Sequence, residues 1–321
     1  MLDRFPKFAG LALFAAGLAS AAHAAEQPIT LDTPSGQIAG TLELPSAAGK
    51  HRVVLIISGS GPTDRDGNNP LIPGRNDSLK QLAAALSEAG IASVRYDKRG
   101  IAASAPAAPE ESAVRFETYV DDAAAWVNKL KADPRFSAPA IIGHSEGSLI
   151  GMLATQQAGA SAFVSIAGIA DAAPAVIRKQ SEGKLPPDLI KENERILAAL
   201  ESGNTADNVP PALATLYRPS VQPYLISWFK YVPTKQLAAL RVPVLIVHGN
   251  TDIQVEVGQA NALHAARPDA TLAIIPGMNH VLKHVRAVPT QQAASYSDPS
   301  LPVDRLLVKA VVDFLKRGPA E

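Results

Sequence analysis

The chain has 321 residues, of which 47% are hydrophobic and 19% charged, so it can bury a full core and does not belong to the disordered class. Its 30 Lys and Arg residues balance 30 Asp and Glu residues, which excludes a strongly basic surface for nucleic acid and favours a small neutral substrate. The chain contains no cysteine, which excludes disulfides and a lipid anchor through cysteine.

Residues 1–25 have the pattern of a secretory signal peptide. Arg4 and Lys7 precede the apolar run 8–19. The stretch Ala22-His23-Ala24 then supplies small residues at the cleavage positions. The run is shorter than the ~20 apolar residues of a retained membrane helix, although an uncleaved anchor is the alternative. We therefore expect residues 26–321 to form a periplasmic or secreted protein with no membrane span after cleavage.

After this segment the chain alternates between predicted strands and helices. A turn at 33–36 joins two extended stretches, 29–31 and 37–44, as an opening hairpin. The predicted strands that follow are 52–58, 91–94, 140–142, 163–166, 242–247 and 271–275, and the predicted helices are 77–89, 116–131, 148–157 and 303–316. This alternation predicts a mostly parallel sheet with helices on both faces.

Residues 170–240 break the alternation because they contain helical patterns, such as 188–200, but no β-rich run. Structureless loops of that length are uncommon, so we expect a helical cap above the strand ends, where such sheets place their active sites. The alternative is a helical layer with no part in substrate access. Apolar and aromatic residues of the interval could form either core or a pocket: Leu216, Tyr217, Tyr224, Leu225, Trp228, Phe229 and Tyr231.

The stretch Gly143-His144-Ser145-Glu146-Gly147 lies between a predicted strand and a predicted helix, as in a nucleophile elbow. The glycines leave room for the tight turn, and Ser145 is the predicted nucleophile. The alternative is a serine in an ordinary glycine-rich turn.

A serine nucleophile needs a histidine base and an acid that orients it. Asp252 follows the predicted strand 242–247 and is the predicted acid, with Asp171 as the alternative. His280 follows the predicted strand 271–275 and is the predicted base, with His284 as its competitor. The remaining histidines considered are interpreted as ordinary surface or strand-end residues: His51, His248 and His264.

Acyl transfer also needs donors for the oxyanion. The backbone N–H of Glu146, directly after the nucleophile, is one predicted donor. The second is the N–H of Ser60, in the glycine-rich loop after strand 52–58, with Gly61 as the alternative. The Glu146 side chain is expected to interact favourably with the helix dipole.

Two other motifs do not support rival functions. The loop 64–68 is similar to a calcium loop, but Asn69 and Arg75 stand where an EF-hand needs glycine and glutamate. Ser181 and Lys184 match S-x-x-K by chance, because the partner motifs are missing. No metal and no cofactor are expected.

Together these residues resemble the α/β-hydrolase superfamily over 27–317. The resemblance is strongest to bacterial serine esterases and serine aminopeptidase-like hydrolases, and it rests on Gly-Ser-Gly-Pro-x-Asp-Arg-Asp-Gly at 59–67 and on Gly-His-Ser-Glu-Gly at 143–147. The turn 97–100 and the stretch 296–302 are similar to the same branch. The resemblance implies an α/β-hydrolase fold and serine-dependent ester hydrolysis with no cofactor.

We expect a carboxylesterase that prefers short acyl chains. A peptidase or amidase with the same triad is one alternative, and a hydrolase fold that only binds a ligand or partner is another. Each methylene in an apolar pocket changes binding by only about 1–3 kcal/mol, so discrimination should be weak. The oligomeric state stays open.

Overall fold

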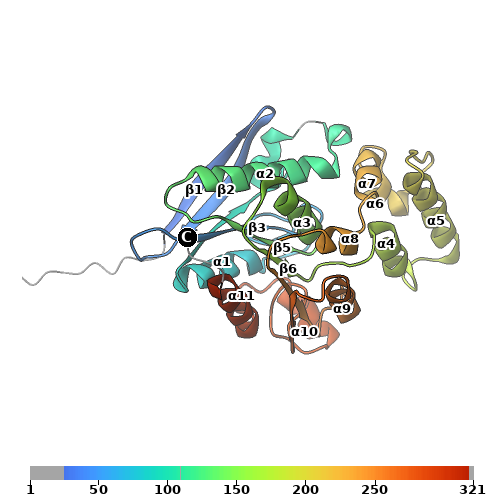
Figure 1. Cartoon of the computed structure of the whole chain (residues 1–321). Helices are drawn as coiled ribbons and strands as arrows, with labels where there is room; N and C mark the ends of the chain where they lie inside the picture. The colour runs from blue at the N-terminus through green and yellow to red at the C-terminus, as the bar shows by residue number, and fades with distance from the viewer. Residues whose placement is uncertain (1–24, 109, 318–321) are drawn as a thin grey trace, which may run out of the picture.

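The computed structural model describes residues 25–108 and 110–317, in which an eight-stranded sheet carries helices on both faces (Figure 1). Residues 1–24, nearly all of the predicted signal peptide, lie outside the described residues, and the peptide stays a prediction. Within the described ranges, no helix combines the length and the apolar character that crossing a membrane requires.

The predicted alternation of strands and helices is confirmed. The strands are β1 Ala25–Thr33, β2 Gly36–Leu44, β3 Arg52–Ile57, β4 Ile91–Tyr96, β5 Ala140–His144, β6 Phe163–Ile166, β7 Val244–Gly249 and β8 Thr271–Ile275. The α-helices are α1 Ser78–Glu88, α2 Phe116–Ala132, α3 Glu146–Ala158, α4 Ala173–Ser181, α5 Pro187–Glu201, α6 Ala214–Tyr217, α7 Gln222–Trp228, α8 Pro233–Ala238, α9 Val257–Ala266, α10 Pro289–Ser295 and α11 Arg305–Arg317. Short 3-10 helices are η1 Ala102–Ala107, η2 Glu111–Ala113 and η3 Pro211–Leu213.

The strands are ordered β1-β2-β4-β3-β5-β6-β7-β8. β1 and β2 form the predicted hairpin, and β2 pairs antiparallel with β4. From β4 to β8 every pairing is parallel. The carboxyl ends of these parallel strands therefore meet at one edge of the sheet, where the polar loops after them can come together.

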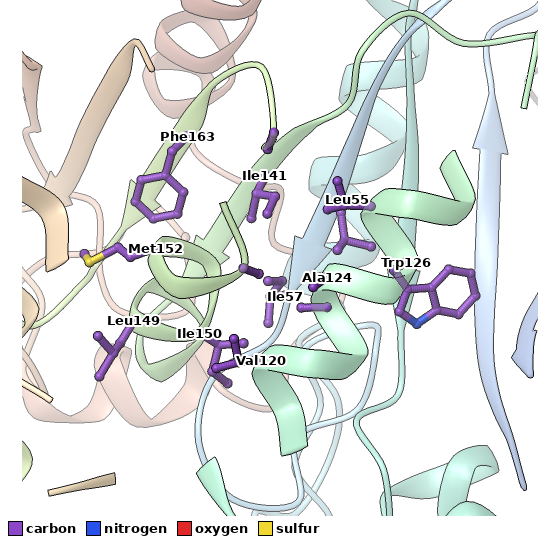
Figure 2. Close-up of a cluster of buried hydrophobic side chains, with 14 of the residues drawn as sticks. Leu55, Ile57, Val120, Ala124, Trp126, Ile141, Leu149, Ile150, Met152 and Phe163 are labelled. Atoms are coloured by element: carbon purple, nitrogen blue, oxygen red, sulfur yellow. The ribbon is translucent and has the colours of Figure 1, made fainter. Parts of the chain in front are cut away.

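The sheet is buried on both faces, which explains the continuous apolar run of β3. Leu55 and Ile57 belong to a cluster that includes residues of α2 and α3, whereas Val54 and Ile56 belong to a second cluster with residues of α1 and α11. Figure 2 shows part of the first cluster, in which Ile150 of α3 lies beside Val120 of α2. Successive side chains of a strand point to opposite faces, so one apolar run supplies both clusters.

Residues 170–240 form the helices α4 to α8 at one end of the sheet (Figure 1). They have a small core of their own: Ile177, Ile196, Leu197, Leu200, Ala206, Leu213, Tyr217 and Leu225. Tyr224 and Trp228 also pack against the main core, where the Trp228 ring stacks on Phe116 with centroids 6.0 Å apart. The helical content of the interval is as predicted, and its action as a cap stays a prediction.

Candidate active site

Ser145 lies at a sharp turn where β5 ends and α3 begins. Its backbone has φ 55° and ψ −121°. Such conformations cost a non-glycine residue about 1–3 kcal/mol and persist only where the surrounding structure imposes them. A Cβ on Gly143 would lie 2.3 Å from the carbonyl oxygen of Gly147, and a Cβ on Gly147 would lie 2.4 Å from that of Ile57. The two glycines therefore allow β3, β5 and α3 to meet beneath the serine.

Asp252 and His280 are joined by a direct hydrogen bond. They follow the neighbouring parallel strands β7 and β8, and the distance between His280 Nδ1 and Asp252 Oδ2 is 2.8 Å. The other oxygen of Asp252 accepts the backbone N–H groups of Gln254 and Val255. Burial by itself raises the pKa of the Asp252 carboxyl, but the charge of His280 and these hydrogen bonds hold the pKa below its usual value. Asp252 is therefore a carboxylate at neutral pH and orients the His280 ring.

The alternative acid and base lie in other contacts. Asp171 accepts a hydrogen bond from Gln259 Nε2 at 2.7 Å, and His284 Nδ1 lies 2.9 Å from Asp304 Oδ2. The structure thus pairs Asp252, rather than Asp171, with His280. The catalytic roles themselves stay predictions.

His144 links the Ser145 turn to the His280 loop. Its Nε2 lies 2.9 Å from the carbonyl oxygen of His280, and since a carbonyl only accepts, Nε2–H is the donor. Burial lowers the pKa of His144 to about 3, so the ring stays neutral in this bond. This contact was not predicted from the sequence, where the only signal was the position of His144 directly before Ser145.

Ser145 and His280 are not hydrogen-bonded to each other in the described part of the chain. The Ser145 N–H donates to the carbonyl oxygen of Ile166 at 2.9 Å, which ties the turn to β6. His280 bonds through Nδ1 to Asp252 and through its carbonyl to His144, which leaves Nε2 for another partner. Catalytic hydrogen bonds are often long or poorly aligned until a substrate binds.

The predicted oxyanion donors border Ser145. Glu146 is the first residue of α3, and the first N–H groups of a helix have no acceptor within it. A Cβ on Gly59 would lie 3.2 Å from the Ser145 Cβ, so the peptide bond between Gly59 and Ser60 begins beside the serine. The Cβ position of Gly61, the alternative donor, has no atom of Ser145 within 4 Å.

His248 is a further histidine beside the acid. It is buried in β7, its Nε2 donates to the carbonyl oxygen of Val255 at 2.8 Å, and the same atom lies 3.8 Å from Asp252 Oδ2. Burial lowers the pKa of His248, so its ring is neutral and supports the loop that carries Asp252. The sequence interpretation of an ordinary strand-end residue missed this contact.

A small cavity lies at Ser145, with a volume of about 20 Å³. Its lining residues are Ser145, Glu146, Leu149, Ile169, Asp171, Ala173, Trp228 and Pro233. Trp228 and Pro233 come from the predicted cap interval. A larger cleft of about 180 Å³ shares Ile169 and Asp171 with this cavity and extends between α4 and the loop after β7.

Comparison with known proteins finds that parts of the chain are similar to hydrolases. Residues 72–221 match the family described as serine aminopeptidase, S33. The chain is also similar to esterase EstD of Thermotoga maritima, with 27% identity over 246 residues that make up 76% of this chain. The chain spans 57% of the length of EstD.

Several solved structures share the fold at low identity. Est1E from Butyrivibrio proteoclasticus, solved with ferulic acid, matches with a TM-score of 0.62 and 19% identity over 91% of this chain and 100% of that one. The alpha/beta hydrolase GrgF from Penicillium sp. sh18 has a TM-score of 0.58 and 18% identity over 92% of this chain and 100% of its own. A thermophilic esterase from Thermogutta terrifontis has a TM-score of 0.55 and 16% identity, with coverages of 92% and 99%.

Proposed function

We propose that this chain is a serine hydrolase of the α/β-hydrolase superfamily that cleaves carboxylic esters. The fold hosts many reactions, so the proposal rests on the site. The observation that carries it is the hydrogen-bonded pair of Asp252 and His280 at the sheet edge where the backbone of Ser145 is strained. The similarity to EstD, which is named an esterase, supports the choice of esters.

In the proposed reaction, Ser145 Oγ attacks the ester carbonyl carbon while His280 Nε2 takes the hydroxyl proton. The resulting oxyanion accepts hydrogen bonds from the N–H groups of Glu146 and Ser60. The bond to the alcohol oxygen then breaks, and His280 returns the proton to that oxygen, leaving the acyl group on Ser145. A water molecule, deprotonated by His280, then attacks the acyl carbon; the bond from that carbon to Ser145 Oγ breaks, His280 returns the proton to Oγ, and the acid leaves. Throughout, Asp252 holds the His280 tautomer and stabilises the imidazolium.

The size of the cavity at Ser145 supports a preference for short acyl chains. Its volume of about 20 Å³ exceeds the roughly 10–15 Å³ that one water-sized probe occupies, which is room for an acetyl methyl group. In this proposal Leu149 and Trp228 limit the acyl chain because both line the cavity, and Trp228 belongs to the interval 170–240. That interval would then act as the cap. The adjoining cleft of about 180 Å³ has room for the alcohol.

Amide hydrolysis is the second candidate, because residues 72–221 match a serine aminopeptidase family. The same nucleophile, base and oxyanion donors serve amides. An aminopeptidase also needs an anion for the substrate ammonium, and Asp171 lines the cavity at Ser145. The Asp171 carboxylate is already engaged by Gln259, so we place esters first.

Labelling with a fluorophosphonate probe tests whether Ser145 is an activated nucleophile. We expect the wild-type protein to be labelled and Ser145→Ala to be unlabelled, with kcat lowered by about 10⁴- to 10⁶-fold. Ser181→Ala is the matched control: its hydroxyl donates to the Ile177 carbonyl within α4, so labelling should persist. An unlabelled wild-type protein would favour the binding-only alternative, and labelling lost only in Ser181→Ala would transfer the role to the S-x-x-K motif.

A substrate series tests the bond and the chain length. p-Nitrophenyl esters from acetate to palmitate are compared with aminoacyl anilides, and we expect acetate to have the highest kcat/KM. Faster turnover of the anilides would favour the aminopeptidase, and an optimum at palmitate would contradict the small acyl cavity.

We also propose that the protein acts outside the cytoplasm, as a periplasmic or secreted enzyme. The support is the charged, apolar and small-residue pattern of residues 4–24. N-terminal sequencing of the cell-fractionated protein should find Ala25 or Glu26 first. A chain that begins at Met1 and sediments with membranes would show that the segment is an anchor.

A further inference from the structure

Lys98 and Glu146 form a buried ion pair next to the candidate active site. Lys98 lies in the loop after β4, and its Nζ is 3.2 Å from Glu146 Oε2. Their side chains expose only 2% and 4% of their surfaces. Burying two charges costs several kcal/mol for each ion, and a protein with apolar residues of similar volume in their place is often equally stable. A buried ion pair is therefore weak evidence for a stabilising role. The location of the pair suggests a different one.

Lys98 holds one end of the peptide group that carries a predicted oxyanion donor. Its Nζ donates to the carbonyl oxygen of Gly59, and the partner N–H of that same peptide group belongs to Ser60. In a trans peptide the C=O and the N–H are coplanar and point in opposite directions, so fixing the Gly59 oxygen also fixes the Ser60 N–H. A cation on the oxygen also polarises the amide, which strengthens the N–H as a donor.

Glu146 connects the same ammonium to the second predicted donor and to the cap interval. Its backbone N–H is the donor next to Ser145, while its side chain holds Lys98 through Oε2 and accepts the Tyr224 hydroxyl through Oε1 at 2.7 Å. Tyr224 comes from α7. The Glu146 side chain is thus committed to buried contacts, beyond the helix-dipole interaction expected from the sequence. Lys98 therefore contacts both segments that carry a predicted oxyanion donor: the Gly59–Ser60 peptide group and Glu146.

We propose that Lys98 is a positioning residue that orients and polarises the oxyanion donor of the Gly59–Ser60 peptide group, with Glu146 as its counter-ion. The proposal rests on the proposed serine hydrolase function. It requires that loss of Lys98 weaken the transition state more than substrate binding, because the oxyanion forms only as the carbonyl is attacked.

The test compares the single variant Lys98→Met with the double variant Lys98→Met/Glu146→Gln, using p-nitrophenyl acetate. Removing an oxyanion donor outright costs about 10²- to 10³-fold in kcat, so a misaligned donor should cost about 10- to 100-fold, with KM changed less than about threefold. The single variant leaves Glu146 buried without its cation and should unfold at lower urea. The double variant has no unpaired charge, and its urea midpoint should recover while kcat stays low.

Lys131→Met is the control, because Lys131 also donates to a backbone carbonyl, that of Ala158, but on the surface. Its kcat should equal that of the wild type. A double variant whose kcat recovers together with its stability, or a variant in which only KM rises, overturns the positioning role. If the single variant does not fold, the double variant decides alone.

The wild-type protein is labelled with fluorophosphonate in the same experiment. An unlabelled, inactive wild type overturns the proposed function and this inference with it. A labelled, active wild type with a fully active double variant overturns this inference alone.

Discussion

Gly147→Ala should damage both the stability and the activity of the protein. Gly147 is the second residue of α3, and a Cβ there would lie 2.4 Å from the carbonyl oxygen of Ile57 and 2.6 Å from that of Ser58. Ordinary C···O contacts are about 3.3 Å or longer, so α3 and the end of β3 must separate by about 1 Å. Both obstacles are backbone atoms of a buried strand end and cannot rotate away.

The magnitude follows from that displacement. Overpacking a dense core costs about 1–3 kcal/mol of stability. We expect a cost near the upper end of this range at Gly147, because the atoms that a Cβ would meet belong to the backbone. The gain in helix propensity from Gly to Ala is about 1 kcal/mol, which leaves a net loss of about 2 kcal/mol. The displacement also moves Gly59 and Ser60 away from Ser145, and a 1 Å misplacement of reacting groups can cost about 10²-fold in rate.

Gly258→Ala is the matched control. Gly258 is the second residue of α9, and a Cβ there meets no atom within 4 Å. The same substitution should therefore raise the free energy of unfolding by about 0.5–1 kcal/mol and leave kcat/KM unchanged. Urea unfolding and hydrolysis of p-nitrophenyl acetate measure both effects. A Gly147→Ala protein with wild-type stability and kcat/KM would refute the close contact between α3 and β3.

Three further predictions concern the acid, the acyl cavity and a buried lysine. Asp252→Asn should lower kcat by about 10⁴-fold because His280 would adopt the wrong tautomer, whereas Asp171→Asn should change it less than about threefold; the reverse order would make Asp171 the acid. Trp228→Ala should shift the optimum of the p-nitrophenyl ester series from acetate to longer chains, and an unchanged profile would place the acyl group elsewhere. Burial lowers the pKa of Lys283 from 10.5 to about 8, so between these pH values the unfolded chain holds the Lys283 proton more tightly than the folded protein does. The free energy of unfolding should therefore rise as the pH increases from 8 to 10.5, by at most about 3 kcal/mol. Urea titrations of Lys283→Met at pH 8 and 10 should lack this rise. If the unfolding free energy changed equally with pH in the variant and the wild type, the lowered pKa would be contradicted.

The sheet and its helices could be predicted because their signals are local. The apolar runs of β3 and β5 are long enough for strands covered on both faces, and the turn signals between elements are glycines, prolines and aspartates. Since the carboxyl ends of parallel strands share an edge, the positions of Ser145, Asp252 and His280 after three different strands already predicted that they would converge. The interval 170–240 could be predicted only as helical, because its action as a cap depends on packing.

The sequence by itself thus determined the alternation of elements, the glycine-flanked turn at Ser145 and the two loops that carry Asp252 and His280. Only the tertiary structure decided which distant residues support them. His144 bonds to His280, 136 residues away, and Lys98 reaches Glu146, 48 residues away. The physical reason is that such contacts follow from the strand order β4-β3-β5-β6-β7-β8 and from the way the loops at the carboxyl ends of these strands fold over that edge of the sheet. No local propensity or spacing encodes that order.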